Sequence, residues 1–345
     1  MDTLRTPDDR FDDLPAFPYE PCYTEIPDGE GGILRVHHVD AGPADGPLVL
    51  CMHGQPTWSY LYRKMIPLLN ERGLRVIAPD LVGFGRSDKP ARREDFSYNR
   101  MVDWMTHWLV ANDIQGATLV GQDWGGLIGL RLVAENPDRF AAVVAANTGL
   151  PLPMELSEER IAAVKEFRSP STATPSMQEM MAAVSSIDPG AREQKFAYWQ
   201  KWTWETEDWP IGMLVSGSLA GGGGEMLSPE EVAAYDAPFP DPSYKMGPRA
   251  MPSQVPMLPD DPSLEKQQAA WKVFSEWHKP FLCSSTDNDP VTAGMDAVFQ
   301  ERIPGTRGVA HVTISGGGHF LQETRSAEFA EAIADFVEAN RTASS

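Results

Sequence analysis

Short apolar runs alternate with amphipathic segments over the first 150 residues of the chain. Residues 33–39 alternate apolar and polar side chains, which predicts a half-buried strand. Residues 48–52, 76–78 and 117–120 are short apolar runs typical of buried parallel strands. Between the last two runs, apolar side chains recur at helical spacing after a candidate N-cap at Ser97; they are Met101, Trp104, Met105, Trp108 and Leu109. Strands separated by helices predict a parallel, doubly wound sheet.

The alternation of strands and helices breaks after the apolar run at 143–146. From about residue 151 to 264 the chain is rich in Pro, Met, Gly and Trp, and the consecutive glycines at 221–224 predict a loop or hinge. The alternation resumes at 281–284 and continues with a helix near 293–302, a strand at 309–314 and a last helix with Phe329, Ile333 and Phe336 on one face. We therefore predict an α/β core domain of residues 1–150 and 265–345, interrupted by a helical cap domain of residues 151–264.

Composition and charge narrow the classes of partner. The 345 residues are 42% hydrophobic and 23% charged, which suits a globular chain with a sizeable core. A net charge of −20 argues against nucleic acid and anionic membrane surfaces. No apolar run has the length of a membrane helix, and the first residues lack the apolar stretch of a signal peptide. The three cysteines are far apart and form no zinc pattern, so we expect a cytoplasmic protein with reduced thiols and no metal site.

The most informative motif is a turn with an aspartate at its centre. The apolar run at 117–120 leads into Gly121-Gln122-Asp123-Trp124-Gly125, and a helical pattern follows directly. A strand, a glycine-flanked turn and a helix make a nucleophile elbow, which normally carries serine. Asp123 stands in the serine position, and its carboxylate is already an anion at neutral pH. Such a nucleophile suits attack on an alkyl carbon better than attack on an ester or amide carbonyl.

Three further features follow strands that should end at the same edge of the sheet. His53-Gly54-Gln55-Pro56 comes after the run at 48–52, and the backbone N–H groups of Gln55 and Trp124 would form an oxyanion hole. An acid, Asp287 or Asp289, follows the strand at 281. His319 follows three glycines near the end of the chain. The order nucleophile, acid, histidine is typical of a catalytic triad on this kind of sheet, and a neutral histidine oriented by a carboxylate activates water without a metal.

With these motifs in place, the sequence resembles the first subfamily of the haloalkane dehalogenases, within the α/β-hydrolase superfamily. The likeness covers nearly the whole chain, and residues 234–241, in the cap, are especially specific to the subfamily; the other matching stretches are 53–64, 78–90, 122–126, 147–151 and 318–320. The resemblance implies an α/β-hydrolase fold with a mostly parallel eight-stranded sheet, helices on both faces and an inserted helical cap. It also implies an enzyme without a cofactor, acting as a monomer or weak oligomer on a small halogenated alkane and water.

The resemblance also implies a reaction and roles for individual residues. Asp123 would displace halide and form an alkyl-enzyme ester, and water activated by His319 and an acid would hydrolyse that ester to alcohol and a proton. For the acid we prefer Asp289 to Asp287, because Asp289-Pro290-Val291 matches the superfamily pattern of an aspartate two residues before an aliphatic side chain. Trp124 would bind the departing halide through its indole N–H. The second halide ligand would come from the cap, whose candidates are Trp199, Trp202, Trp204 and Trp209; the subfamily pattern F-x-x-W at 196–199 favours Trp199.

An epoxide hydrolase is the nearest alternative function. Epoxide hydrolases of this fold use the same aspartate, histidine and acid, so the elbow does not separate the two activities. They protonate the leaving oxygen with two cap tyrosines, and the cap offers Tyr198, Tyr235 and Tyr244. The tryptophan at position 199 favours the dehalogenase.

Overall fold

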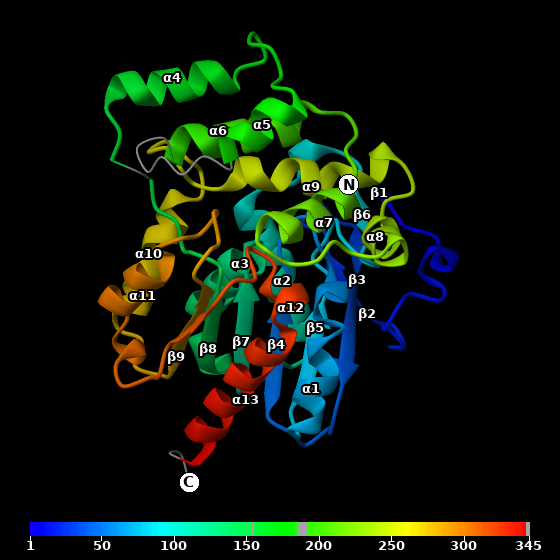
Figure 1. Ribbon diagram of the computed structural model, residues 1–345, viewed down its shortest axis with the longest axis vertical. Coiled ribbons are helices and arrows are strands. Elements are labelled where there is room, and N and C mark those ends of the chain that lie inside the picture. The colour runs from blue at the N-terminus through cyan, green and yellow to red at the C-terminus, as the bar shows by residue number, and fades with distance from the viewer. Residues whose placement is uncertain (154, 185–191, 343–345) are drawn as a thin grey trace.

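A twisted eight-stranded sheet forms the centre of the computed structural model, which describes residues 1–153, 155–184 and 192–342 (Figure 1). The strands lie in the order β10-β9-β8-β7-β4-β5-β3-β2. Only β3 runs against the others, because it pairs antiparallel with both β2 and β5. The strand bounds are β2 (Cys22–Pro27), β3 (Ile33–Ala41), β4 (Leu48–Met52), β5 (Arg75–Pro79), β7 (Ala117–Gln122), β8 (Phe140–Ala146), β9 (Phe281–Thr286) and β10 (Val312–Ile314). The α/β-hydrolase fold with a mostly parallel sheet is thus confirmed.

The strands form where the apolar runs predict them, with one shortened at its start. β4 has the predicted bounds, and β5, β7, β8 and β9 each contain the predicted run. β10 begins only at Val312, three residues later than expected. Residues before it form turns, and the Nδ1 atom of His311 accepts a hydrogen bond of 3.1 Å from the backbone N–H of Cys283 in β9. A side chain therefore takes the place of the first ladder bond between these strands.

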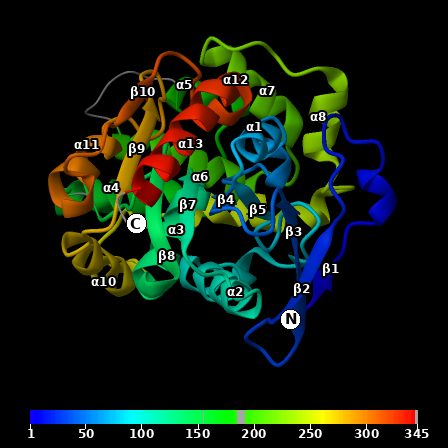
Figure 2. The same cartoon turned by 90° about the horizontal axis from the view of Figure 1, so that it is seen from below.

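Helices cover both faces of the sheet. Figure 2 shows α1 (Met65–Glu71) and α13 (Ser326–Thr342) on one face and α2 (Tyr98–Ala111), α3 (Trp124–Glu135) and α10 (Leu264–Ser275) on the other. The predicted cap of α2 is present, since the Ser97 side chain accepts a hydrogen bond from the backbone N–H of Arg100. The shorter elements are α11 (Met295–Arg302), α12 (Leu321–Thr324) and a two-stranded sheet of β1 (Thr3–Leu4) and β6 (Lys89–Pro90).

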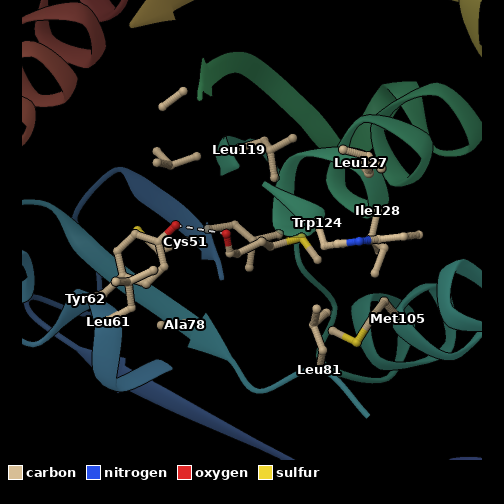
Figure 3. Close-up of a cluster of buried hydrophobic side chains, with 14 of the residues drawn as sticks. Cys51, Leu61, Tyr62, Ala78, Leu81, Met105, Leu119, Trp124, Leu127 and Ile128 are labelled. Carbon is tan, nitrogen blue, oxygen red and sulfur yellow. Dashed lines mark hydrogen bonds between the residues drawn. The ribbon is translucent and has the colours of Figure 1, made fainter. Parts of the chain in front are cut away.

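The core beneath the carboxyl edge is apolar and closely packed. Figure 3 shows Cys51 of β4, Leu119 of β7 and Leu127 of α3 in one buried cluster. Trp124 and Met105 of α2 belong to the same cluster. A rigid base of this kind limits the movement of the turns that lie above it.

A helical segment between β8 and β9 lies above the sheet (Figure 1). The helices of this segment that precede α10 are α4 (Glu158–Arg168), α5 (Met177–Val184), α6 (Arg192–Glu205), α7 (Ile211–Gly221), α8 (Pro229–Asp236) and α9 (Met246–Ala250). The glycine run is a loop only in part, because α7 ends at Gly221 and Gly222 is its C-cap. The limits of the cap at residues 151 and 264 stay a prediction. In the described residues, no helix combines the length and the apolar character that crossing a membrane demands.

Candidate active site

Asp123 lies at the tip of the turn between β7 and α3, in a backbone conformation that few non-glycine residues adopt. Its φ of 50° and ψ of −128° are strained, and neighbouring hydrogen bonds hold it. Its N–H donates to the carbonyl of Asn147 at 3.0 Å, and its own carbonyl accepts from Thr148 Oγ1 at 2.7 Å. A Cβ on Gly125 would lie only 2.0 Å from the carbonyl oxygen of Met52, so glycine is required at that position. The turn therefore presents the Asp123 carboxylate at the carboxyl edge of the sheet.

The two carboxylate oxygens of Asp123 have different neighbours. Oδ1 accepts a hydrogen bond of 2.7 Å from the backbone N–H of Gln55. Oδ2 lies 3.4 Å from Nε2 of His319. The N–H of Trp124, the second predicted oxyanion donor, has no hydrogen-bond partner among the described residues. One oxygen is thus held by the β4 turn, and the other is directed towards the histidine.

His319 follows β10, and its ring lies between the carboxylates of Asp123 and Asp289. Its Nδ1 lies 3.0 Å from Oδ1 of Asp289, which is buried at 4% exposure. Asp289 also accepts hydrogen bonds from the N–H groups of Val291 and Thr292 and from the Thr292 hydroxyl. Asp287 is exposed and instead binds the N–H of Gly316 at 2.8 Å and the Ser315 hydroxyl. Of the two candidate acids, the structure brings Asp289 to the histidine.

Burial and two neighbouring carboxylates set the protonation of the site. Burial alone would lower the pKa of His319, but the negative charge of Asp289 and the hydrogen bonds to Asp123 and Asp289 outweigh it and raise that pKa to about 10. Burial likewise opposes ionisation of Asp289, but the charge and hydrogen bond of His319 hold its pKa below the usual range. The pair therefore carries a proton on the histidine while Asp123 is a carboxylate.

The turn after β4 is held by its own side chains. The peptide unit that supplies the Gln55 N–H has the carbonyl of Gly54 at its other end, and that carbonyl accepts from the N–H and the hydroxyl of Thr57, at 3.0 and 2.9 Å. The N–H of Leu81 donates to Nε2 of His53 at 2.9 Å, so the other ring nitrogen, Nδ1, carries the hydrogen that bonds to the Gly54 carbonyl at 3.0 Å. His53 thereby supports the turn that presents the Gln55 N–H.

Sequence reasoning missed two residues of the site. The side-chain nitrogen of Gln122 donates to the carbonyl of His319 at 3.0 Å and lies 3.2 Å from its Nε2. The side-chain nitrogen of Asn147 donates to the carbonyls of Gly318 and His319 at 2.9 and 3.0 Å. Both residues stand at the carboxyl ends of strands, Gln122 in β7 and Asn147 just after β8, and that position is the signal that could have identified them.

The predicted halide ligands lie on the core and on the cap. Trp124 is the first residue of α3, is 3% exposed, and packs edge-on against Tyr98 at 5.2 Å between ring centroids. Trp199 lies on α6, half-buried and stacked on Trp202 at 5.7 Å, with Trp209 next to both. In the described part of the chain, the indole N–H groups of Trp124 and Trp199 have no protein acceptor. The assignment of Trp199 as the second ligand stays a prediction.

Comparisons with known proteins agree with this geometry. Residues 47–326 match the family model described as the alpha/beta hydrolase fold. A haloalkane dehalogenase of Psychrobacter cryohalolentis is 46% identical over 99% of each chain. Another, of Mycolicibacterium paratuberculosis, is 39% identical over 98% of this chain and 99% of the relative. A solved structure, a tetrameric haloalkane dehalogenase from Paraglaciecola agarilytica, matches with a TM-score of 0.75 and 32% identity, covering 96% of this chain and 97% of that one.

Proposed function

This chain belongs to the haloalkane dehalogenases, hydrolases that act on carbon–halide bonds, and we propose that it cleaves its substrate through a covalent ester on Asp123. The observation that carries the mechanism is the carboxylate at the tip of the elbow, with one oxygen held by the Gln55 N–H and the other near a histidine paired with a buried acid. A small halogenated alkane is the substrate, and the products are an alcohol, a halide ion and a proton.

In the first step, Oδ2 of Asp123 attacks the carbon that bears the halogen. The new bond joins Oδ2 to that carbon, and the carbon–halogen bond breaks with its electron pair on the halide. The Gln55 N–H holds Oδ1 at 2.7 Å, so it fixes the direction in which Oδ2 points. The halide gains charge in a buried pocket and needs donors already in place, which the indole N–H groups of Trp124 and Trp199 supply.

In the second step, water attacks the carbonyl carbon of the Asp123 ester. His319 removes a proton from the water through Nε2, and Asp289 holds the ring by the hydrogen bond to Nδ1. Oδ1 becomes the oxyanion and keeps the Gln55 N–H, while the free N–H of Trp124 supplies a second donor. The intermediate then collapses: the bond from the carbonyl carbon to the former Oδ2 atom breaks, the proton of the added hydroxyl group passes to that oxygen, and the alcohol leaves Asp123 as a carboxylate.

Two of the three cap tyrosines, Tyr198 and Tyr235, have contacts of their own in the structure. Tyr235 is fully buried, and its hydroxyl donates to Oε1 of Glu323 at 2.5 Å. That hydroxyl is therefore committed to a partner outside the nucleophile. Tyr198 packs on Phe167 at 4.6 Å between ring centroids. The partner of the Tyr235 hydroxyl thus argues against that residue as a proton donor to a leaving oxygen.

Two measurements test the activity and its mechanism. The protein is mixed with short bromoalkanes and with an aryl epoxide, and bromide and diol are measured; diol without bromide would refute the dehalogenase mechanism. A single turnover with enzyme in excess is then run in water enriched in ¹⁸O. A covalent ester predicts unlabelled alcohol and ¹⁸O in the Asp123 peptide, whereas direct attack by water on the alkane would label the alcohol.

Oligomeric state is a separate question, since the solved relative from Paraglaciecola agarilytica is tetrameric. For this chain a monomer or weak oligomer stays our prediction, to be checked by light scattering.

A further inference from the structure

The loop of residues 287–289, which carries the acid Asp289, makes a series of contacts with the loop of residues 316–319, which carries His319. Asp287 accepts a hydrogen bond from the N–H of Gly316, and Asp289 pairs with the ring of His319. Between them, Oδ1 of Asn288 accepts from the N–H of Gly318 at 2.9 Å. The three glycines before His319 all have positive φ, of 69°, 96° and 61°. Because glycine has no side chain, these residues make no side-chain contacts that would hold the loop in place. Its path depends on the contacts made from outside.

The amide of Asn288 has a second partner in the cap. Its nitrogen donates to the carbonyl of Gly222 at 2.8 Å, at the end of α7. Gly222 is buried and packs against the loop that carries His319, since a Cβ built on Gly222 would be 2.6 Å from Cα of Gly318. In the opposite direction, a Cβ on Gly318 would be 2.9 Å from Cα of Gly222. The glycine turn of the cap and the residue before His319 are therefore in backbone contact, and Asn288 links them.

We propose that Asn288 and Gly222 are positioning residues for the hydrolysis step, and that the cap holds His319 in place through them. This inference rests on the covalent mechanism proposed above, in which only the second step uses His319. Asp123 is fixed by other elements, namely the Gln55 N–H after β4 and the Asn147 carbonyl after β8. A change at Asn288 or Gly222 should therefore leave alkylation of Asp123 intact and slow the attack of water on its ester.

The chain offers a matched pair of neighbouring glycines for the test. Gly222→Ala places a methyl group against Gly318, whereas at Gly221 an added Cβ has nothing within 4 Å. Neither glycine has a positive φ, so alanine fits both backbones. Asn288→Ala is the second perturbation; Asn288 is exposed and the change adds no atoms, so the variant should fold even if Gly222→Ala does not.

Alkylation and hydrolysis are followed separately by rapid quench and intact-mass spectrometry with a bromoalkane that the wild type consumes. Because a displacement of about 1 Å in a reacting group costs up to about 100-fold, we expect hydrolysis to slow about 10- to 100-fold in Gly222→Ala. The loss of two hydrogen bonds predicts a slowing of hydrolysis of about tenfold in Asn288→Ala. Alkylation should stay within about threefold of wild type in both variants, and Gly221→Ala should match wild type in both steps.

The outcomes separate this inference from the proposed function. Equal slowing of both steps, or unchanged hydrolysis in folded Asn288→Ala, would overturn the positioning role while leaving the dehalogenase mechanism standing. A wild-type protein that releases halide without ever forming an adduct would overturn the covalent mechanism itself.

Discussion

Replacing Gly54 by alanine should displace the nucleophile directly. A Cβ built on Gly54 would lie 2.4 Å from Oδ1, 2.5 Å from Cβ and 2.8 Å from Cγ of Asp123. Gly54 does not have a positive φ, so alanine suits its backbone and the contact with Asp123 is the main obstacle. Ordinary contacts begin near 3.4 Å, so the Asp123 carboxylate must move by about 1 Å.

That displacement sets the size of the effect. A reacting group misplaced by about 1 Å loses up to about 100-fold in rate, which corresponds to roughly 2.7 kcal/mol in the activation free energy. The loss should appear in alkylation, because Oδ2 no longer points at the substrate carbon. Overpacking should also lower the free energy of unfolding by about 1–3 kcal/mol, so stability has to be measured alongside activity.

The assay is the rate of adduct formation on Asp123 at saturating bromoalkane, with thermal melting as the test of folding. Gly217→Ala in α7 is the control, since an added Cβ there has nothing within 4 Å. A folded Gly54→Ala protein that alkylates within about threefold of wild type would refute the placement of Asp123 as nucleophile beside this turn.

Further variants test the remaining parts of the site. His319→Ala should still be alkylated, but its ester should persist, and intact-mass spectrometry that finds no adduct on folded protein would contradict this division of labour. Asp289→Asn should slow hydrolysis by about 10³- to 10⁴-fold, with alkylation measured in parallel and expected to be unchanged. Asp123→Asn should lower the pKa of His319 from about 10, because the charge and hydrogen bond of Asp123 both raise it, and NMR titration of the imidazole measures this. The pKa of His319 in the folded state exceeds the ordinary histidine value of about 6.5. Protonated His319 should therefore stabilise the fold fully below about pH 6.5, and this contribution should be lost as the pH rises towards about 10. Melting curves of wild type and His319→Ala across this pH range measure the effect.

The strands and the elbow could be predicted because their causes are local. Buried parallel strands need short apolar runs, and each run yielded a strand. Close backbone contacts around the turn require glycine at positions 121 and 125, so the spacing of these glycines in the sequence is enough to predict the turn. The preference for Asp289 over Asp287 came from the family resemblance, through the pattern of an aspartate two residues before an aliphatic side chain, and in the structure the N–H of that aliphatic residue, Val291, binds the Asp289 carboxylate.

Contacts between distant segments left no such signal. The amide of Asn288 binds the carbonyl of Gly222, 66 residues earlier in the chain, and neither residue belongs to a sequence pattern that predicts this contact. The same holds for the buried hydrogen bond of Tyr235 to Glu323, which joins the cap to the helix after His319. The cap tryptophans show what sequence spacing cannot predict. Trp199, Trp202 and Trp209 pack against one another, so their spacing along the chain does not distinguish a halide ligand from the tryptophans packed beside it.

In the mechanism proposed above, the charge of Asp123 also links the two steps. While Asp123 is a carboxylate, it helps to hold the proton on His319, so the histidine cannot act as a base. Alkylation would turn Asp123 into a neutral ester and remove that contribution, so we expect it to lower the pKa of His319 when a base is first needed. The proton then leaves, and the neutral ring can accept another from water. Hydrolysis restores the carboxylate, and with it the protonated histidine of the resting enzyme. We therefore propose that Asp123 contributes to the protonation state of His319, whose ring is oriented by the hydrogen bond to Asp289.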